Sequence, residues 1–403
     1  MSVRPLRART RGDVVTNQSA NPPSATSPGH VLAVLRAHGP MTRQELQERI
    51  GLSRVTLVER LDALRRQGFV RASGHRDSSG GRRAELLEVD DETSAALTVD
   101  LGQSHAALAV TDLRGSVAAR ETHRLPVRHR PDDVVPMLLD AGRELLSRTG
   151  RTGALRAMAL SLPGQIDHER GVTVAPPTMP DWNGRTLRDP FEDAFGVPVL
   201  LENDANALAF GDYCAMGRPD STVLGVKVGT GIGAGVVVSG RIHRGESGTA
   251  GEMGHMRIEG SDRRCGCGRR GCVAANASGS ALVRDLRAVG VRSMDDVVRR
   301  VADGRGDAVR AAAEAGHLVG TVLATVVTII NPRFVRVGGA VGILPPFLEA
   351  VRKAVEEYAH ASALRGLEVS GSELGEDGAF VGLAGLVADA TLSPAAVDAT
   401  LAP

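Results

Sequence analysis

Between residues 42 and 68 the sequence carries two signals for the start of a helix, each followed by a glycine that would end that helix. Thr42 and Glu45 have the spacing of a capping box, in which each side chain bonds the other residue's backbone amide. Gly51 provides a tight turn, Ser53 is a good cap for the next helix, and Gly68 ends that helix. The apolar spacing predicts a second helix that buries Leu46 and Ile50, then a third that buries Val58, Leu61 and Leu64.

A further helix and a two-stranded wing flank this pair. Helical periodicity begins near His30 and is stopped by Gly39-Pro40. Two strand-like pieces, residues 69–72 and 84–89, are joined by the polar loop 73–83. Residues 30–90 are therefore predicted to form a winged helix-turn-helix domain, whose third helix would enter the major groove of DNA.

The predicted recognition helix presents polar side chains at its start. Arginine can reach guanine edges or phosphates, and threonine can contact a phosphate or a thymine methyl group. Arginines on a glycine-rich wing suit a narrow minor groove. The predicted DNA contacts are Ser53, Arg54, Val55, Thr56 and Arg60 on the helix, with Arg82 and Arg83 on the wing. The alternative is a small helical bundle that contacts proteins.

Charge and composition agree with duplex DNA as a partner. Residues 1–90 carry 15 arginines against 9 acidic residues, a net +6, whereas the remainder carries 33 basic and 38 acidic residues, a net −5. A basic segment on a slightly acidic body indicates where a polyanion binds. Aromatic residues make up 2% of the chain, which disfavours stacking of single-stranded nucleic acid as the main binding device.

The remaining bulk features indicate a cytoplasmic protein with no membrane partner. Residues 1–29 are rich in Pro, Ser, Thr and Asn, so we expect a disordered tail, and no secretory signal is visible there. The longest apolar run, residues 318–330, is shorter than the roughly 20 residues of a membrane helix. Four cysteines are too few for a disulfide framework in a chain of 403 residues.

From about residue 91 the pattern changes to short strands. Residues 95–101, 105–112 and 116–125 are expected to form consecutive antiparallel strands, followed by a helix over 132–148 and a strand over 157–161. A strand at 197–201, a helix from Ala205 and a hairpin of 223–228 with 234–238 follow. By fold analogy, this repeated order suggests two related α/β lobes of the actin-like (ribonuclease H-like) ATPase type.

One histidine and three cysteines have the spacing of a closed metal site. His255 lies ten positions before Cys265, and Cys267 and Cys272 follow within eight residues. One imidazole and three thiolates fill a tetrahedral zinc shell and leave no open position, which predicts one structural zinc ion per chain. The alternative is a set of free thiols. Cys214 lies outside the cluster and is expected to be an ordinary core thiol.

A polar run, Glu202-Asn203-Asp204-Ala-Asn206, joins a predicted strand to a predicted helix. Asn and Asp side chains at the carboxyl end of a strand can bind sugar hydroxyls, and Asp204 has the chemistry of a general base. The same run could equally be a plain helix cap.

Several of these motifs occur in one order that resembles the ROK family of repressors and sugar kinases. They are the run 202–206, the turn Gly229–Gly233, the string Ala250-Gly-Glu-Met-Gly-His255 and the cysteine cluster, together with Leu162-Pro-Gly164, Trp182 and Val337-Gly-Gly339. The similarity extends from about residue 30 to 390 and makes residues 91–403 a sensing region of two lobes. The family implies that Asn203, Asp204, Glu252 and His255 contact a sugar, that Asp204 holds the position of the kinases' catalytic base, and that His255 also binds zinc.

Two positions depart from the family pattern. Where family kinases have a first phosphate loop of the form Asp-x-Gly-Gly-Thr, this chain has Asp100-Leu-Gly102-Gln103-Ser104. Gln103 adds a side chain where the backbone must approach a phosphate closely, so we predict no enzymatic activity. The other nucleotide-loop positions remain as Gly229, Gly231, Gly233, Gly338 and Gly339. At position 274 alanine replaces the glutamate that sugar-binding members usually have, which suggests a substituted sugar, a glycoside or weak binding.

The sequence therefore predicts a sugar-responsive transcriptional regulator, most simply a repressor. It would bind double-stranded operator DNA and a small sugar or sugar derivative, and would form a homodimer or homotetramer, because paired half-sites multiply specificity. One alternative is an ATP-dependent, glucokinase-like sugar kinase with a fused DNA-binding domain. Another is a regulator that acts without a ligand.

Overall fold

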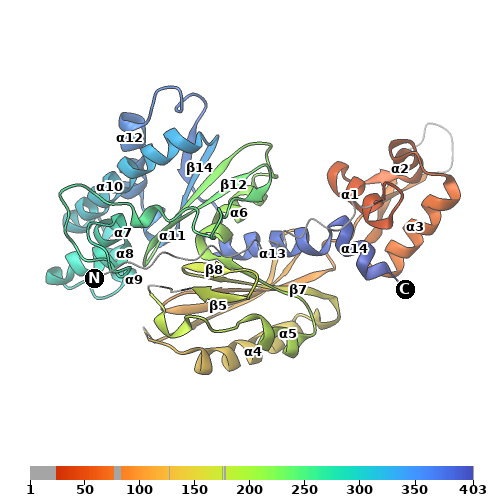
Figure 1. Ribbon diagram of the computed structural model, residues 1–403, viewed down its shortest axis with the longest axis horizontal. Helices are drawn as coiled ribbons and strands as arrows, with labels where there is room; N and C mark the ends of the chain where they lie inside the picture. The colour runs from red at the N-terminus through yellow and green to blue at the C-terminus, as the bar shows by residue number, and fades with distance from the viewer. Residues whose placement is uncertain (1–23, 77–82, 127, 175, 177, 403) are drawn as a thin grey trace, which may run out of the picture. The chain divides into compact units, whose positions relative to one another are not determined.

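The computed structural model describes residues 24–76, 83–126, 128–174, 176 and 178–402. These residues form two compact units. The first contains the residues up to Asp90 together with those from Ala390 onward, and the second runs from Asp91 to Asp389. Figure 1 shows the elements of each unit.

The first unit is a winged helix. Its elements are α1 (Pro28–His38), β1 (Met41–Thr42), α2 (Arg43–Ile50), α3 (Arg54–Arg66), β2 (Val70–Arg76), β3 (Ala84–Val89) and α14 (Pro394–Leu401). Both side chains of the Thr42–Glu45 capping box are engaged, and Gly51 ends α2 with a φ of 76°. Ser53 caps α3 as predicted. The short strand β1, which the sequence analysis did not predict, makes the wing a three-stranded sheet of order β1-β3-β2.

The apolar stripe of α3 contains Leu61 and Leu64 as predicted, but its first member is Leu57 and not Val58. Leu57, Leu61 and Leu64 are buried, whereas Val58 is only partly covered. The observed stripe has the i, i+4, i+7 spacing of one helix face. In α2, Leu46 is fully buried and Ile50 is half-buried.

Helix α14 belongs to this first unit although the sequence analysis placed its residues in the sensing region. It packs on α1 and buries Val397. The Asp398 carboxylate accepts a hydrogen bond of 2.7 Å from the backbone amide of Gly29, in the first turn of α1. A Cβ atom on Gly29 would lie 2.2 Å from the Pro394 carbonyl oxygen, so glycine permits the close approach. A short helix this distant in sequence gives no local sign of its partner.

The second unit contains two five-stranded sheets with the same topology. The first lobe has β4 (Ala95–Leu101), β5 (His105–Asp112), β6 (Val117–Arg124), β7 (Leu155–Leu162) and β10 (Val199–Asn203). The second has β11 (Val223–Val228), β12 (Ile232–Val238), β13 (Arg241–Ile242), β14 (Phe334–Gly338) and β15 (Glu368–Gly371). Each sheet joins three consecutive antiparallel strands to two parallel ones, in the orders β10-β7-β4-β5-β6 and β13-β12-β11-β14-β15. This repeat confirms two related α/β lobes.

Helices cover these sheets and connect their strands. They are α4 (Pro131–Arg148), α5 (Arg188–Phe195), α6 (Asp204–Ala215), α7 (Val273–Ala277), α8 (Gly279–Asp285), α9 (Met294–Ala302), α10 (Gly306–Ile330), α11 (Gly339–Gly342), α12 (Pro345–Tyr358) and α13 (Gly378–Thr391). Short 3-10 turns lie at Thr152–Ala154, Pro180–Trp182, Met253–His255, Arg287–Val289 and Gly375–Asp377. A small hairpin pairs β8 (Gln165–Asp167) with β9 (Val172–Val174).

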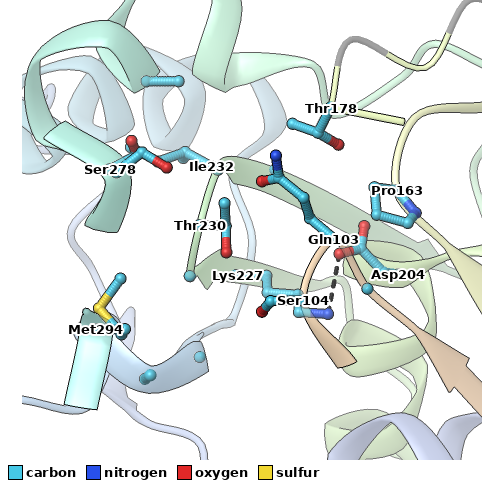
Figure 2. Close-up of a pocket in the computed structure, with 18 of the residues that line it drawn as sticks. Gln103, Ser104, Pro163, Thr178, Asp204, Lys227, Thr230, Ile232, Ser278 and Met294 are labelled. Carbon is cyan, nitrogen blue, oxygen red and sulfur yellow. Dashed lines mark ion pairs between the residues drawn. The ribbon is translucent and has the colours of Figure 1, made fainter. Parts of the chain in front are cut away.

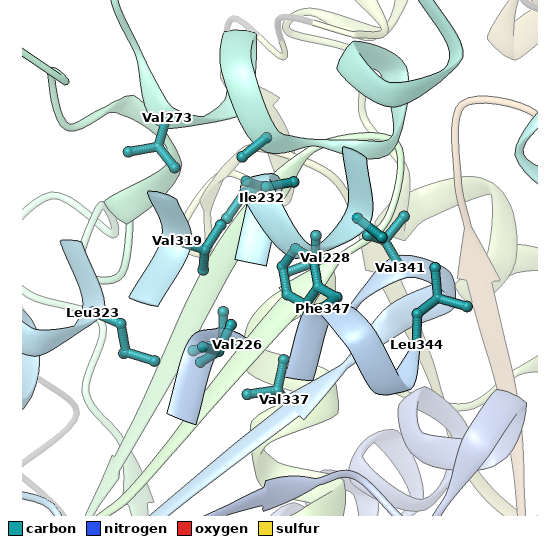
Figure 3. Close-up of a cluster of buried hydrophobic side chains, with 14 of the residues drawn as sticks. Val226, Val228, Ile232, Val273, Val319, Leu323, Val337, Val341, Leu344 and Phe347 are labelled. Carbon is teal, nitrogen blue, oxygen red and sulfur yellow. The ribbon is translucent and has the colours of Figure 1, made fainter. Parts of the chain in front are cut away.

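The core of the second lobe lies between its sheet and the pair α10 and α12 (Figure 3). Val226 and Val228 of β11 face α10, where Val319 and Leu323 meet them. On the other face of the sheet, Gly225 allows α6 to pack closely, with Ala209 against the strand. Helix α10 is long and apolar enough to cross a membrane by length and composition alone, but its inner face forms part of this core.

Candidate functional site

The first turn of α3, the predicted recognition helix, is exposed. Arg54 is exposed, and Val55 has 70% of its surface accessible although it is apolar. The Ser53 hydroxyl accepts a hydrogen bond from the backbone amide of Thr56, and the two hydroxyls lie 2.8 Å apart. An apolar side chain beside a cationic one at a helix start has the form of a base-reading surface.

The other predicted DNA-contacting arginines differ in their surroundings. The Arg60 Nε donates a hydrogen bond of 3.1 Å to the Thr26 carbonyl, so Arg60 also anchors the segment before α1. Arg83 is exposed just before β3. Arg82 lies outside the described residues.

The predicted metal ligands converge. One ligand atom from each of His255, Cys265, Cys267 and Cys272 lies within 4.8 Å of all the others. The His255 Nδ1 is 3.6 Å from the Cys265 sulfur, and the Cys267 and Cys272 sulfurs are 3.7 Å apart. A tetrahedral zinc ion with normal bond lengths places such ligand atoms about 3.5–3.8 Å apart, so the residues fit zinc.

A cleft of about 2810 Å³ opens in the second unit. Its lining includes every sequence-predicted sugar, metal and nucleotide-loop residue, and also Gln103 and Ala274. Figure 2 shows Gln103, Thr230, Ile232 and Asp204 around it. The volume exceeds the 300–1,000 Å³ typical of small-molecule pockets, so the cleft has room for a sugar and for further groups.

Asn203 serves as a helix cap as well as lining the cleft. Its side-chain oxygen accepts hydrogen bonds from the amides of Ala205 and Asn206, and its Nδ2 donates to the Gly164 carbonyl. These bonds fix the start of α6, so that Asp204, the next residue, is presented to the cleft.

Glu202 and Arg244 stabilise the start of α6 through buried hydrogen bonds and an ion pair. Glu202 is 1% exposed, and its carboxylate bonds the Asn203 amide, the Asn206 side chain and the Arg244 guanidinium. Arg244 comes from the loop after β13, which therefore reaches back to α6. The sequence analysis did not assign Glu202 a role, because its partner lies 42 residues away.

Lys227 is the site residue that the sequence analysis missed most clearly. Its ammonium lies 2.9 Å from the Asp204 carboxylate, as Figure 2 shows, and 3.9 Å from the Asp100 carboxylate. Burial alone would lower the pKa of Lys227, but the charges of Asp100 and Asp204 outweigh it and raise the pKa. Burial would likewise raise the pKa of Asp100, yet Lys227, His105 and Ser161 hold it far below its usual value. Lys227 and Asp100 are therefore both charged at neutral pH.

Glu252 connects the metal ligands to the open cleft. Its carboxylate lies 3.7 Å from the His255 Nε2, on the side of the ring opposite Nδ1. Burial raises the pKa of Glu252, with Asp204 adding to the effect and His255 opposing it. His255 is thus placed to orient Glu252 as well as to bind a metal.

The nucleotide-loop glycines fall into two groups. A Cβ atom on Gly229 or Gly231 would meet nothing within 4 Å, so these two leave the backbone open to the cleft. Gly339 has a φ of 82°, and a Cβ there would lie 2.6 Å from the Val228 carbonyl oxygen. Gly102 and Gly338 are also closely packed, against His105 and Leu208. Close packing, together with the positive φ of Gly339, accounts for glycine at positions 338 and 339.

Comparisons with known proteins agree with this architecture. Residues 96–390 match the model of the ROK family, and residues 27–77 match that of the MarR family. The xylose repressor of Bacillus spizizenii is 26% identical over 361 residues, which cover 89% of this chain and 93% of the repressor. The crystal structure of a ROK family transcriptional regulator, a homologue of the E. coli MLC protein, shares the fold with a TM-score of 0.77 at 24% identity, covering 93% of this chain and 98% of its own. The ROK hexokinase of Thermus thermophilus is 31% identical, with a TM-score of 0.59, over 72% of this chain and 97% of the enzyme.

Proposed function

The chain belongs to the ROK family, and from this premise we propose that it is a transcriptional repressor whose binding to operator DNA responds to a sugar. The observation that carries the proposal is the presence, in one chain, of a winged helix with an exposed recognition turn and of a polar cleft. A relative of nearly the same length is a xylose repressor, which supports it.

The effector is proposed to bind at the start of α6 and beside the cysteine cluster. Asp204 and Glu252 would accept hydrogen bonds from sugar hydroxyls, His255 would orient Glu252, and Asn203 would hold the helix start. Ala274 lines the same cleft and leaves room where a longer acidic side chain would otherwise stand, which favours a substituted sugar or a glycoside. Binding would change the DNA equilibrium only through different affinities for its two states.

We propose one structural zinc ion per chain, held by His255, Cys265, Cys267 and Cys272. The ion would fix the loop that carries His255. Three thiolates and a neutral imidazole are a donor set that favours zinc over magnesium or calcium.

Sugar kinase activity is the second candidate, because a hexokinase is similar over 72% of this chain and Asp204 lines the cleft. The Asp204 carboxylate, which a kinase would use as its base, is already ion-paired with the Lys227 ammonium. Gln103 also extends into the cleft (Figure 2). We therefore propose that the protein does not phosphorylate sugars. Sugar-dependent ADP release that disappears in Asp204→Ala would establish the kinase instead.

The protein is proposed to act in the cytoplasm as a homodimer or homotetramer, without a membrane partner. A single winged helix reads one half-site, and a second copy supplies the other. Sedimentation analysis with and without operator DNA tests the assembly.

The deciding experiment is a thermal-shift screen of the full chain against a carbohydrate library, followed by operator binding with each stabilising sugar. A ligand that binds the folded state raises the melting temperature. A sugar that stabilises the protein and changes its operator affinity supports the proposal. If calorimetry shows no binding by any sugar while operator binding persists, the protein is a ligand-independent regulator.

A further inference from the structure

Two carboxylates converge on one point of the cleft. Asp100 comes from β4 in the first lobe, and Asp204 begins α6. Their oxygens lie 3.9 Å and 2.9 Å from the same nitrogen, the Lys227 Nζ on β11 of the second lobe. All three side chains are largely shielded from solvent, with 16–23% of their surface exposed. Without a cation between them, two partly buried carboxylates would repel each other.

The backbone around Lys227 leaves room for this side chain. In the sheet, Lys227 is paired with Gly233 on β12 and with Gly338 on β14. Directly paired residues point to the same face, so both cross-strand neighbours of Lys227 lack a side chain there. The lysine stem can therefore extend across the strands to Asp204 and Asp100.

The choice of lysine stands out from the composition. The chain contains 46 arginines and two lysines, Lys227 and Lys353. An ammonium is a compact charge on a flexible stem, whereas a guanidinium is a wide planar fork. The narrow space between the two carboxylates, beside two glycines, suits the ammonium of a lysine better than a guanidinium.

We propose that Lys227 is a built-in cation that takes the place of a divalent metal ion between Asp100 and Asp204, and so excludes metal-bound phosphate from the cleft. Paired carboxylates are the ligands that hard cations such as Mg²⁺ and Mn²⁺ prefer, and phosphoryl transfer uses such an ion to hold the phosphates. Here an ammonium neutralises the carboxylates without any ligand. The cleft would then bind uncharged polyols without a nucleotide or a metal ion. This last step deepens the proposed sugar-sensing function and rests on it, whereas the role of Lys227 as a cation does not.

The test is Mn²⁺ binding to the full chain. Binding is measured by electron paramagnetic resonance, at low ionic strength and without sugar. Lys227→Met keeps the length of the side chain and removes its charge, and the variant should bind Mn²⁺ at least roughly tenfold more tightly than wild type. Lys353→Met is the matched control, because the only other lysine is exposed and pairs with Glu349. It should behave as wild type. Mn²⁺ has little preference for thiolates, so the cysteine cluster does not compete.

Two further variants make the result decisive. Adding Asp100→Asn to Lys227→Met should abolish the gained Mn²⁺ affinity, because one of the two carboxylates is lost. Lys227→Thr, whose side chain is shorter, should also gain Mn²⁺ affinity. It replaces Lys227→Met in the test if that variant misfolds. The inference is overturned if wild type binds Mn²⁺ as tightly as Lys227→Met, or if the folded neutral variants gain no affinity. Neither result depends on sugar or DNA, so it leaves the proposed repressor function to its own test.

Discussion

The His255 ring is held at 3.7 Å from the Glu252 carboxylate through Nε2, while its Nδ1 faces the Cys265 sulfur at 3.6 Å. One imidazole thus links the cysteine cluster to a carboxylate that lines the cleft. Ring nitrogens that bind a metal on one side and a carboxylate on the other are fixed in a single orientation. Loss of the proposed zinc ion is therefore expected to disturb the cleft and not the cysteine loop alone.

The metal prediction is tested with Cys267→Ser. Wild type should contain about one zinc ion per chain, since four ligands close the site, and the variant should lose it because the hydroxyl is a poor substitute for a thiolate. Elemental analysis of protein prepared without chelators gives the content. Cys214→Ser, outside the cluster, is the control and should keep its zinc. Zinc-free wild type would refute the site.

Asp204→Ala should abolish the sugar response and leave operator affinity without sugar near that of wild type. Losing a charge-assisted hydrogen bond costs about 1.5–3 kcal/mol, or roughly one to two orders of magnitude in sugar affinity. Operator titrations with and without the effector measure both quantities. Asp220→Ala, an exposed acidic residue of the same unit, is the control. An unchanged sugar response in Asp204→Ala would contradict the assignment.

Arg54→Ala should reduce discrimination between operator variants. A bidentate arginine–guanine contact contributes about 1–3 kcal/mol of discrimination, and Arg54 is exposed at the start of α3. Competition mobility shifts with single-base operator variants provide the measurement. Arg143→Ala removes the same charge from the other unit and should change nothing. Equal loss of affinity for all sequences would make Arg54 a phosphate contact.

Asp212 predicts a pH dependence of stability. It is 4% exposed, Ser372 donates a hydrogen bond to Oδ1, and Oδ2 has no partner among the described residues. Burial raises the pKa of Asp212 from 3.8 to about 6, so the folded protein holds this proton more tightly than the unfolded chain does. Its contribution to stability is full below about pH 4 and is lost as the pH rises through about 6.

Asp212→Asn should therefore raise the free energy of unfolding by up to about 2–3 kcal/mol at pH 8, with a gain that shrinks toward pH 4. Denaturant unfolding between pH 4.5 and 8 follows the gain. Asp303→Asn, an exposed change of the same charge, is the control. A gain that does not vary with pH would show that burial of the charge is not its origin.

Local signals in the sequence predicted the elements better than the site. The caps at Thr42 and Ser53 lie within three residues of the amides they bond, so the spacing alone reveals them. The cysteine cluster was equally readable, because three ligands fall within eight residues. Lys227 could not be placed, since its role depends on Asp100 from another sheet. Its rarity among 46 arginines was the one available sign.

The contact between α14 and α1 predicts that Asp398→Ala weakens the winged helix. Removing a side chain that caps a helix amide costs about 0.5–2 kcal/mol, and the Asp398 carboxylate accepts from Gly29. Operator affinity and the melting temperature should both fall. Thr400→Ala, whose hydroxyl donates to the Ala396 carbonyl within α14, is the control. A wild-type melting profile for Asp398→Ala would remove α14 from the account of this unit's stability.

The same contact has a consequence for how the chain is made. Residues 390–402 belong to the winged-helix unit but follow residues 91–389 in the sequence, so the ribosome synthesises them after those residues. During translation α3 emerges early, on a domain that still lacks α14. A nascent or prematurely terminated chain would thus lack part of its DNA-binding unit. A chain whose winged helix is complete already carries the region that senses the sugar.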